Sequence, residues 1–272
     1  MPFLKTLENN RTLTIFWLLA VITFCIRAFI SFSHELIVGN GGYYPLQVRT
    51  VLERGELAFA DMPLLLYLDA GIIKLILFFG VTISDQLIFT TVQLVDSLSI
   101  TLILIPLYKF MQLTKNSKFN FFNLIIILYA VLTFYTLNLI THSQKNSLAI
   151  FFFVFSSYYL VQYLTTTEHK KSMLLAILFL LLTGLTHFGK FVFAVIFSAI
   201  YILLRYRLIA ILPIIMLFGS SLLLIYYFDT SRFERLLSVG EELFRKFPNP
   251  PQMIKIVLYS ILVFISIKGL KK

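Results

Sequence analysis

Runs of apolar residues recur along the whole chain, and several are close to the ~20 residues that a helix needs to cross the ~30 Å hydrocarbon core of a membrane. Because only helices and closed barrels satisfy every backbone hydrogen bond within lipid, such runs predict membrane-spanning helices. Only 13% of the residues are charged, against about 25% in an ordinary globular domain. The sequence therefore predicts an all-α, polytopic transmembrane helical bundle that forms a single domain over residues 1–272. The predicted segments are 13–32, 63–82, 86–108, 119–139, 147–164, 172–186, 190–204, 208–227 and 252–267.

The formal net charge of +10 reflects basic residues in the short loops between these runs. In a membrane protein such residues set the orientation, because loops rich in Lys and Arg stay in the cytoplasm. This distribution excludes nucleic acid as a partner and indicates the lipid bilayer instead. The single cysteine, Cys25, lies inside the first run, so neither a disulfide framework nor a cysteine-based metal site is available.

The loop charges orient the later segments. Basic stretches at 109–118, 170–171, 205–207 and 268–272 alternate with three loops that are poorer in Lys and Arg. The positive-inside rule places the four basic stretches in the cytoplasm and the other three loops outside.

The N-terminal part creates a conflict of parity. Lys5 and Arg11 place the N-terminus in the cytoplasm, but nine crossings from there would put all four basic stretches outside. In the solution that we favour, segment 63–82 makes no net crossing. This leaves about eight crossings, with jacket or interfacial helices in the first outer loop, residues 33–62. In the other solution, the N-terminus lies outside and all nine segments cross.

The favoured topology gathers most of the polar candidates on the outer face. It places the first outer loop, 33–62, and a second long outer loop, 228–251, on the same side as two short polar loops. The polar side chains brought together there are His34, Glu35, Asp61, His142, Lys145, His187 and Lys190. We therefore expect the functional site on this face of a multi-pass protein of the plasma (inner) membrane.

A short amphipathic helix is predicted over residues 44–54 in the first outer loop. Asn40-Gly41-Gly42 is a turn signal, Pro45 suits the first turn of a helix, and Gly55 is a stop signal. The apolar face consists of Tyr44, Val48, Val51 and Leu52, and the opposite face of Gln47, Arg49, Glu53 and Arg54. This pattern predicts a helix in the membrane interface, and on pattern alone a cap without chemistry is the simpler interpretation.

A series of motifs follows the first span. Arg27 near the end of that span and Glu35 just beyond it precede "GGYYPLQVRTVLERGEL", "DMPLLLYLDAGIIKLILFFG", "SQKNSLAIFFFVFSSYYLVQYL" and "LTGLTHFGKF". This series resembles the GT-C superfamily of polytopic membrane glycosyltransferases, which includes protein mannosyltransferases, aminoarabinose transferases and oligosaccharyltransferase catalytic subunits. The first outer loop of that superfamily carries jacket helices. Most of its members are longer than 272 residues, so the resemblance implies a short or truncated member.

The resemblance implies an enzyme of the cell envelope that moves a sugar from a polyprenyl-phosphate or polyprenyl-pyrophosphate donor to a glycan, lipid or protein acceptor. The chemistry needs a carboxylate that takes the acceptor proton or orients the acceptor, and cations that hold the leaving phosphate. Glu35 and Asp61 are the candidate catalytic carboxylates. The candidate substrate-binding residues are Arg27, Tyr43, His142, Lys145, Asn146, His187 and Lys190.

No cofactor follows from the motifs with certainty. The histidines and carboxylates lack the spacings that are typical of zinc sites. A divalent cation, Mg²⁺ or Mn²⁺, on Glu35 or Asp61 stays open, because such ions need few protein carboxylates.

One departure from the superfamily pattern favours other functions. Gly41-Gly42 stands before Tyr43-Tyr44, where many members have an acidic residue, so a non-catalytic membrane subunit of the same fold is one alternative. Another is a transporter or flippase of a lipid-linked substrate, with Asp69, Lys74 and Asp96 as a polar path. The sequence shows no internal repeat, which disfavours the transporter.

Two charged residues inside the predicted spans also have purely structural interpretations. Arg27 is close enough to a helix end to reach the outer headgroups with its side chain. Asp96 lies in the middle of a segment, so it needs a partner within the membrane, for which Lys74 or a cluster of Ser and Thr is expected.

Overall fold

The computed structural model describes residues 2–33, 42–113, 121–132, 144–165 and 169–206, together with residues 219, 223, 226, 227 and 234. Every regular element over these residues is a helix. The chain divides into two compact units, Met1–Leu224 and Ile225–Lys272, and the helices described below belong to the first unit. A single domain over residues 1–272 stays a prediction.

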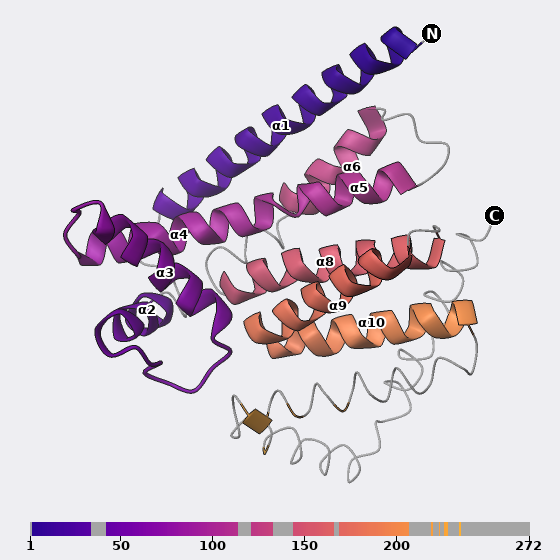
Figure 1. Ribbon diagram of the computed structural model, residues 1–272. Helices are drawn as coiled ribbons and strands as arrows, with labels where there is room; N and C mark the ends of the chain where they lie inside the picture. Colours follow the sequence, from indigo (N-terminus) through magenta and orange to yellow (C-terminus); the bar gives the residue numbers. More distant parts are fainter. Residues whose placement is uncertain are drawn as a thin grey trace, which may run out of the picture. The chain divides into compact units, whose positions relative to one another are not determined.

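The helices follow the predicted apolar segments. In chain order they are α1 (Pro2–Ser33), α2 (Tyr43–Arg54), α3 (Leu64–Phe78), α4 (Asp85–Thr101), α5 (Leu104–Leu113), α6 (Phe121–Leu132), α8 (Gln144–Thr165), α9 (His169–Thr186) and α10 (Phe188–Tyr206) (Figure 1). The predicted segments 208–227 and 252–267 lie largely or wholly outside the described residues.

Three helical stretches among the described residues are long and apolar enough to cross a membrane. They are Leu13–Ser33, Asp85–Leu113 and Gln144–Thr165, and the apolar stretches Lys171–Thr186 and Phe188–Leu203 are shorter. The large apolar side chains of Trp17, Leu18 and Phe29 on α1 are exposed, as a lipid-facing surface requires. The structure thus supports a helical membrane protein, and the number of crossings stays a prediction.

Helix α1 packs antiparallel to α4 and α5. Near the end of α1, the carbonyl of Ser31 accepts a hydrogen bond of 3.0 Å from Nε2 of Gln93 on α4. Nearer its start, the ring of Phe16 packs on the ring of Tyr108 on α5, with the centroids 4.8 Å apart. The connection through α2 and α3 therefore begins and ends at one end of the unit. This packing supports the topology in which segment 63–82 makes no net crossing.

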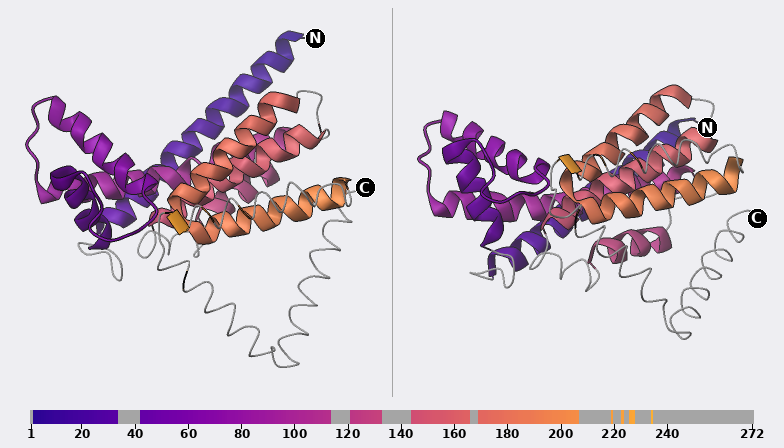
Figure 2. Two further views of the ribbon diagram at one scale, coloured as in Figure 1. Left: turned by 60° about the horizontal axis from the view of Figure 1, so that its bottom comes forward. Right: turned by 90° about the horizontal axis from the view of Figure 1, so that it is seen from below.

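Helices α8, α9 and α10 run side by side in alternating directions (Figures 1 and 2). Ser156 of α8 donates a hydrogen bond of 2.9 Å to the carbonyl of Ala176 on α9, which fixes their antiparallel register. On the returning α10, the rings of Phe193 and Phe197 pack edge-on against Phe153 of α8.

One end of the unit holds the helix termini that adjoin three of the loops predicted to lie outside. Leu148 of α8 packs in the same core as Val92 and Val95 of α4, so these two helices run parallel and start at the same end. We call this the polar end, defined by Ser33, Asp85, Gln144 and His187 at the adjoining helix termini. At the opposite end, Lys109, Lys171 and Arg205 stand near the ends of α5, α9 and α10. The described helices thus separate the two kinds of loop as the charge pattern predicts.

The stretch Asp85–Leu113 is broken into two helices by a proline. Pro106 has no N–H group, so the carbonyl of Leu102 lacks its usual helical partner four residues later. The backbone tightens there, because the N–H groups of Ile103 and Ile105 donate to the carbonyls of Ile100 and Leu102, at 3.1 Å each. Helix α4 packs against α1, α3 and α8, and α5 packs against α6 and α8.

Helix α2 confirms most of the amphipathic prediction and corrects one part of it. Gly55 ends the helix in the left-handed conformation, with φ 78°, and its N–H donates to the carbonyl of Val51 at 3.0 Å. Val48 and Val51 are buried as predicted, but Gln47 is buried too. The assignment of Gln47 to the polar face was wrong because it lies four residues before Val51 and so on the same side of the helix.

The apolar core at the polar end is shared by α2, α3 and α4. Val48 of α2, Leu66 and Ile73 of α3, and Ile88 of α4 are almost fully buried within it. An exposed ion pair of 2.9 Å between Arg49 and Asp85 also joins α2 to the first residue of α4. This packing fixes the segment between α2 and α3, which carries the predicted site residue Asp61.

Candidate active site

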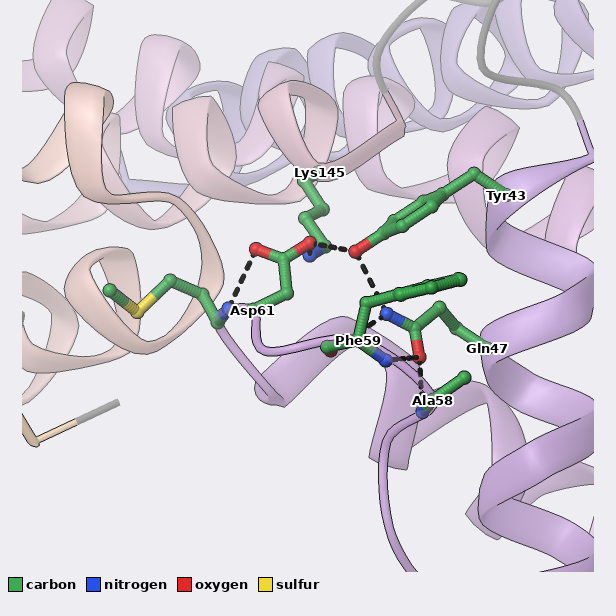
Figure 3. A network of polar contacts seen from close by, with 7 residues as sticks. Tyr43, Gln47, Ala58, Phe59, Asp61 and Lys145 are labelled. Carbon is green, nitrogen blue, oxygen red and sulfur yellow. Dashed lines mark hydrogen bonds and ion pairs between the residues drawn. The ribbon is translucent and has the colours of Figure 1, made fainter. Parts of the chain in front are cut away.

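Asp61 and Lys145 form a buried ion pair between two distant parts of the chain (Figure 3). Asp61 lies in the segment before α3, and Lys145 is the second residue of α8. Both side chains are almost fully buried, at 4% and 6% exposure. The sequence predicted each residue as part of the site, and the structure brings the two together across 84 positions of the chain.

Tyr43 also donates a hydrogen bond to the Asp61 carboxylate. Its hydroxyl donates to Oδ2, the same oxygen that receives Lys145, and the N–H of Met62 donates to Oδ1 at 2.7 Å. The ammonium group of Lys145 also lies over the Tyr43 ring, 5.6 Å from its centroid. This is a cation–π distance. Three predicted site residues, Tyr43, Asp61 and Lys145, therefore form one cluster, which we call the paired cluster.

Gln47 holds the paired cluster to the backbone beside it. Its Oε1 accepts hydrogen bonds from the N–H groups of Ala58 and Phe59, at 2.8 and 3.3 Å. Its Nε2 donates to the carbonyl of Phe59 at 3.0 Å and to the Tyr43 hydroxyl at 2.9 Å. Figure 3 shows this amide between the Tyr43 ring and the irregular segment that leads to Asp61. Gln47 thus positions both the tyrosine and the loop.

The start of α8 gives the paired cluster a positive environment. A helix N-terminus carries a partial positive charge, so a lysine in the first turn needs a compensating anion. Asp61 supplies that anion in the structure. A phosphate group is attracted by the same combination of an ammonium group and a helix N-terminus.

Arg27 belongs to a second buried cluster. Its side chain is fully buried, as are Thr23 and Ser31, which lie one turn before and after it on the same side of α1. Its charge interacts with that of Asp96 on α4, and Ser147 of α8 lies beside Asp96. Arg27 therefore points into the bundle rather than toward the outer headgroups. Lys74, one predicted partner of Asp96, is exposed to the outside of the unit.

Asp69 of α3 joins Arg27 and Asp96, and we call these three residues the charged cluster. Asp69 is fully buried, and neither of its carboxylate oxygens has a hydrogen-bond partner among the described residues. Burial raises the pKa of Asp69 well above its usual value, and the neighbouring carboxylate of Asp96 raises it further.

The remaining predicted site residues differ in what the structure says of them. Glu35 and His142 lie outside the described residues. Asn146 is half-buried beside Lys145 on α8. His187 stands between α9 and α10, where its Nδ1 accepts a hydrogen bond of 3.3 Å from the N–H of Lys190. His187 and Lys190 therefore lie at the polar end, where this hydrogen bond lies in the first turn of α10.

Sequence reasoning missed two residues of the site. Gln47 was assigned to the solvent side of α2, although its spacing from Val51 is the signal that places it inside. Ser147 was not singled out, although it lies two residues after Lys145 and joins the two clusters along α8. Over the described ranges, no group of three or more His, Cys, Asp and Glu side chains is arranged to hold a metal ion.

No protein-family model, curated protein or solved structure matches the chain. The resemblance to the GT-C superfamily therefore rests on the motifs alone, and function must be argued from the residues of the paired cluster.

Proposed function

We propose that this protein is a membrane glycosyltransferase of the GT-C type. It transfers a sugar from a polyprenyl-phosphate-linked donor to an acceptor at the outer face of the plasma membrane. The observation that carries the proposal is the paired cluster: a carboxylate, a lysine and a tyrosine from two separate motifs meet at the polar end. In the proposed topology about eight segments cross the membrane, and α2 and α3 form the jacket of the first outer loop.

Lys145 is the proposed phosphate partner. Transfer of the sugar leaves negative charge on the donor phosphate, and a positioned cation stabilises that charge in the transition state. Lys145 has the support of the α8 N-terminus and is held in place by Asp61 and by the ring of Tyr43. His187 and Lys190 lie at the same end and are further predicted partners of the donor. Arg27, the third predicted partner, is buried inside the bundle, where its charge interacts with that of Asp96.

Asp61 is proposed to position these groups, and Glu35 to take the acceptor proton. The contacts of Asp61 support this division, because Lys145 and Tyr43 share one carboxylate oxygen and Met62 binds the other. The Asp61 side chain is also only 4% exposed, which leaves an acceptor hydroxyl little access to it. Glu35 follows the first span in the position where the resemblance expects an acidic residue.

The test is sugar transfer by the purified protein in lipid nanodiscs. A panel of polyprenyl-phosphate donors with radiolabelled sugars is offered with lipid, glycan and peptide acceptors, and transfer of label to one acceptor class is the expected result. Lys145→Gln should lower the turnover number by ~10² or more, as loss of a positioned charge stabiliser does. Glu35→Gln should abolish transfer with donor binding retained, and Asp61→Asn should have a smaller effect.

Lys74→Gln is a matched control, because this lysine is exposed on α3 and outside both clusters. Its turnover should equal that of the parent protein. A parent protein that binds a donor yet transfers to none of the acceptors would instead be a non-catalytic membrane subunit. In that case Gly41, in place of an acidic residue, is the informative position.

A second candidate function, transport of a lipid-linked substrate, is favoured by one observation. Asp69 and Asp96 are buried carboxylates inside the helix unit, and buried ionisable groups often mark transport pathways. Movement of a fluorescent polyprenyl-phosphate lipid between the leaflets of vesicles that contain the protein tests it. Transfer without such movement supports the glycosyltransferase, and movement without transfer supports the transporter.

A further inference from the structure

The buried charges of the described residues do not balance. Five ionisable side chains are buried: Arg27, Asp61, Asp69, Asp96 and Lys145. Asp61 and Lys145 neutralise each other in the paired cluster. The charged cluster then holds one cation, Arg27, and two carboxyl groups. With all three groups ionised it would carry one uncompensated negative charge away from water, which is strongly unfavourable.

The position of each carboxyl group decides which one stays ionised. Helix α4, which carries Asp96, packs against α1, which carries Arg27, and against α3, which carries Asp69. The oxygens of both carboxyl groups lack a hydrogen-bond partner within the described part of the chain. The charge of Arg27 favours the ionised form of Asp96, whereas the second carboxylate disfavours the ionised form of Asp69, so Asp69 gains more from binding a positive charge. Asp69 is therefore the group at which such a charge would bind.

We propose that Arg27, Asp69 and Asp96 form a proton-binding site inside the helix unit, in which Asp69 carries one proton and Asp96 stays ionised beside Arg27. The proton neutralises the surplus charge and converts one Asp69 oxygen into a hydrogen-bond donor toward Asp96. Release of the proton leaves Asp69 as a carboxylate, so the site takes up and gives back one proton without any other reactant. Sugar transfer is not required for this equilibrium.

The start of α8 offers the proton a polar route to the polar end. Ser147 lies beside Asp96, and Gln144, one turn earlier, is buried with both side-chain polar atoms lacking a partner among the described residues. Lys145, on α8, is bound to Asp61. The other charged side chains that the structure describes on the helices packed against α3 and α4 lie at the surface: Arg49, Glu53, Arg54, Lys74, Asp85 and Lys171. None of them supplies the missing positive charge.

Infrared spectroscopy of the full chain in nanodiscs, with carboxyl-labelled aspartate, tests the proposal. A protonated carboxyl group gives a carbonyl band that an ionised one lacks, and the label separates aspartate from glutamate. At neutral pH the parent protein should show the band of one protonated aspartate, and the band should move in D₂O. Asp69→Asn should remove the band, whereas Asp85→Asn, at an exposed position, should leave it unchanged.

Charge substitution at Arg27 makes the test quantitative. Arg27→Gln removes the only cation of the charged cluster, so both carboxyl groups should become protonated and the band should double. Arg27→Lys keeps the charge and should keep a single band. No band in the parent protein would overturn the proposal, and so would a band that survives Asp69→Asn. A bound Na⁺ would leave both carboxyl groups ionised, so it also predicts no band. A band that does not move in D₂O would overturn the route along α8.

Discussion

The paired cluster and the charged cluster adjoin each other along α8, yet they handle buried charge in opposite ways. In the paired cluster one lysine forms an ion pair with one aspartate, and Tyr43 and a backbone N–H donate hydrogen bonds to the same carboxylate. The charged cluster contains one arginine and two carboxyl groups from different helices. The first cluster is balanced by side chains alone. The second is balanced only when it also binds a proton.

This difference suggests different sensitivities to substitution. A balanced buried ion pair is destabilised by the loss of either member, because the remaining charge has no partner. An unbalanced cluster should be stabilised when its surplus carboxyl group is replaced by a neutral side chain. It should be destabilised when its single cation is removed. The predictions below use that asymmetry, beginning with the location that the two clusters share.

The largest expected effect is an all-or-none difference in thiol labelling, which tests whether both clusters lie on the outer side of the membrane. In a Cys25→Ser background, Gly39→Cys and Ser143→Cys should react with an impermeant thiol reagent added from outside, and Lys170→Cys should not. The reason is that Ser33, residues 42–62 and the start of α8, which flank the first two positions, lie at the polar end, whereas the start of α9 lies at the other. Labelling is read by mass shift on a gel. If Gly39→Cys reacts only after the cells are permeabilised, the shared outer location of the two clusters is wrong.

The next largest effect is expected at the ion pair. Lys145→Gln or Asp61→Asn should each lower the free energy of unfolding by about 3–5 kcal/mol, the usual cost of leaving one buried charge without its partner. The double variant should lose less than the sum of the two, and unfolding in mixed detergent measures this coupling. Strictly additive losses would show that the two side chains do not form the pair in the folded protein.

A smaller loss is expected from Tyr43→Phe. This change removes only the hydroxyl that donates to the Asp61 carboxylate, and a hydrogen bond to a charged group contributes about 1.5–3 kcal/mol. The ring stays, so its contact with Lys145 is retained. Tyr67→Phe is the matched control, because its hydroxyl donates to the Gly55 carbonyl at an exposed position, so its change in unfolding free energy should be smaller. Equal losses in the two variants would remove Tyr43 from the cluster.

The smallest effect, within about 1 kcal/mol, is expected for Asp69→Asn below about pH 4, where the aspartate is protonated in both the folded and the unfolded protein. At higher pH the variant should become more stable than the parent protein. Because the folded-state pKa of Asp69 is raised above its unfolded value of about 3.9, its contribution to stability is complete below that value and is lost as pH rises to the folded-state pKa. The parent protein should therefore lose stability between about pH 4 and that folded-state pKa. Asp69→Asn should flatten that slope, and an unchanged slope would mean that Asp69 is not the titrating group.

Local signals in the sequence were sufficient for the helices and for the sorting of their ends. The apolar runs predicted the described helices, Gly55 marked the end of α2, and the loop charges indicated that residues 63–82 return to the end where they start. These features depend on residues that are neighbours in the chain or on the sum of many charges. Both are visible without a structure.

The pairing of side chains could not be predicted in the same way. Asp61 and Lys145 were each selected, but nothing local links two residues that are 84 positions apart. Arg27 was assigned two alternatives, because the sequence shows its distance from a helix end and not the direction of its side chain. Its partner Asp96 lies on another helix, so only the packing of α1 on α4 could decide between them.

The break at Pro106 bears on how the protein meets bilayers of different thickness. At 1.5 Å per residue, the 29 residues of Asp85–Leu113 would span about 43 Å as one straight helix, whereas the 22 residues of α8 span about 33 Å. Only the second length matches a hydrocarbon core of ~30 Å. We expect the α4–α5 junction to adapt first to a thinner or thicker membrane, because Pro106 leaves the carbonyl of Leu102 without its helical partner there, while α4 and the start of α8 share one apolar core. Hydrophobic mismatch would then be absorbed away from the buried charges, and lipid chain length should affect the far end of the molecule first.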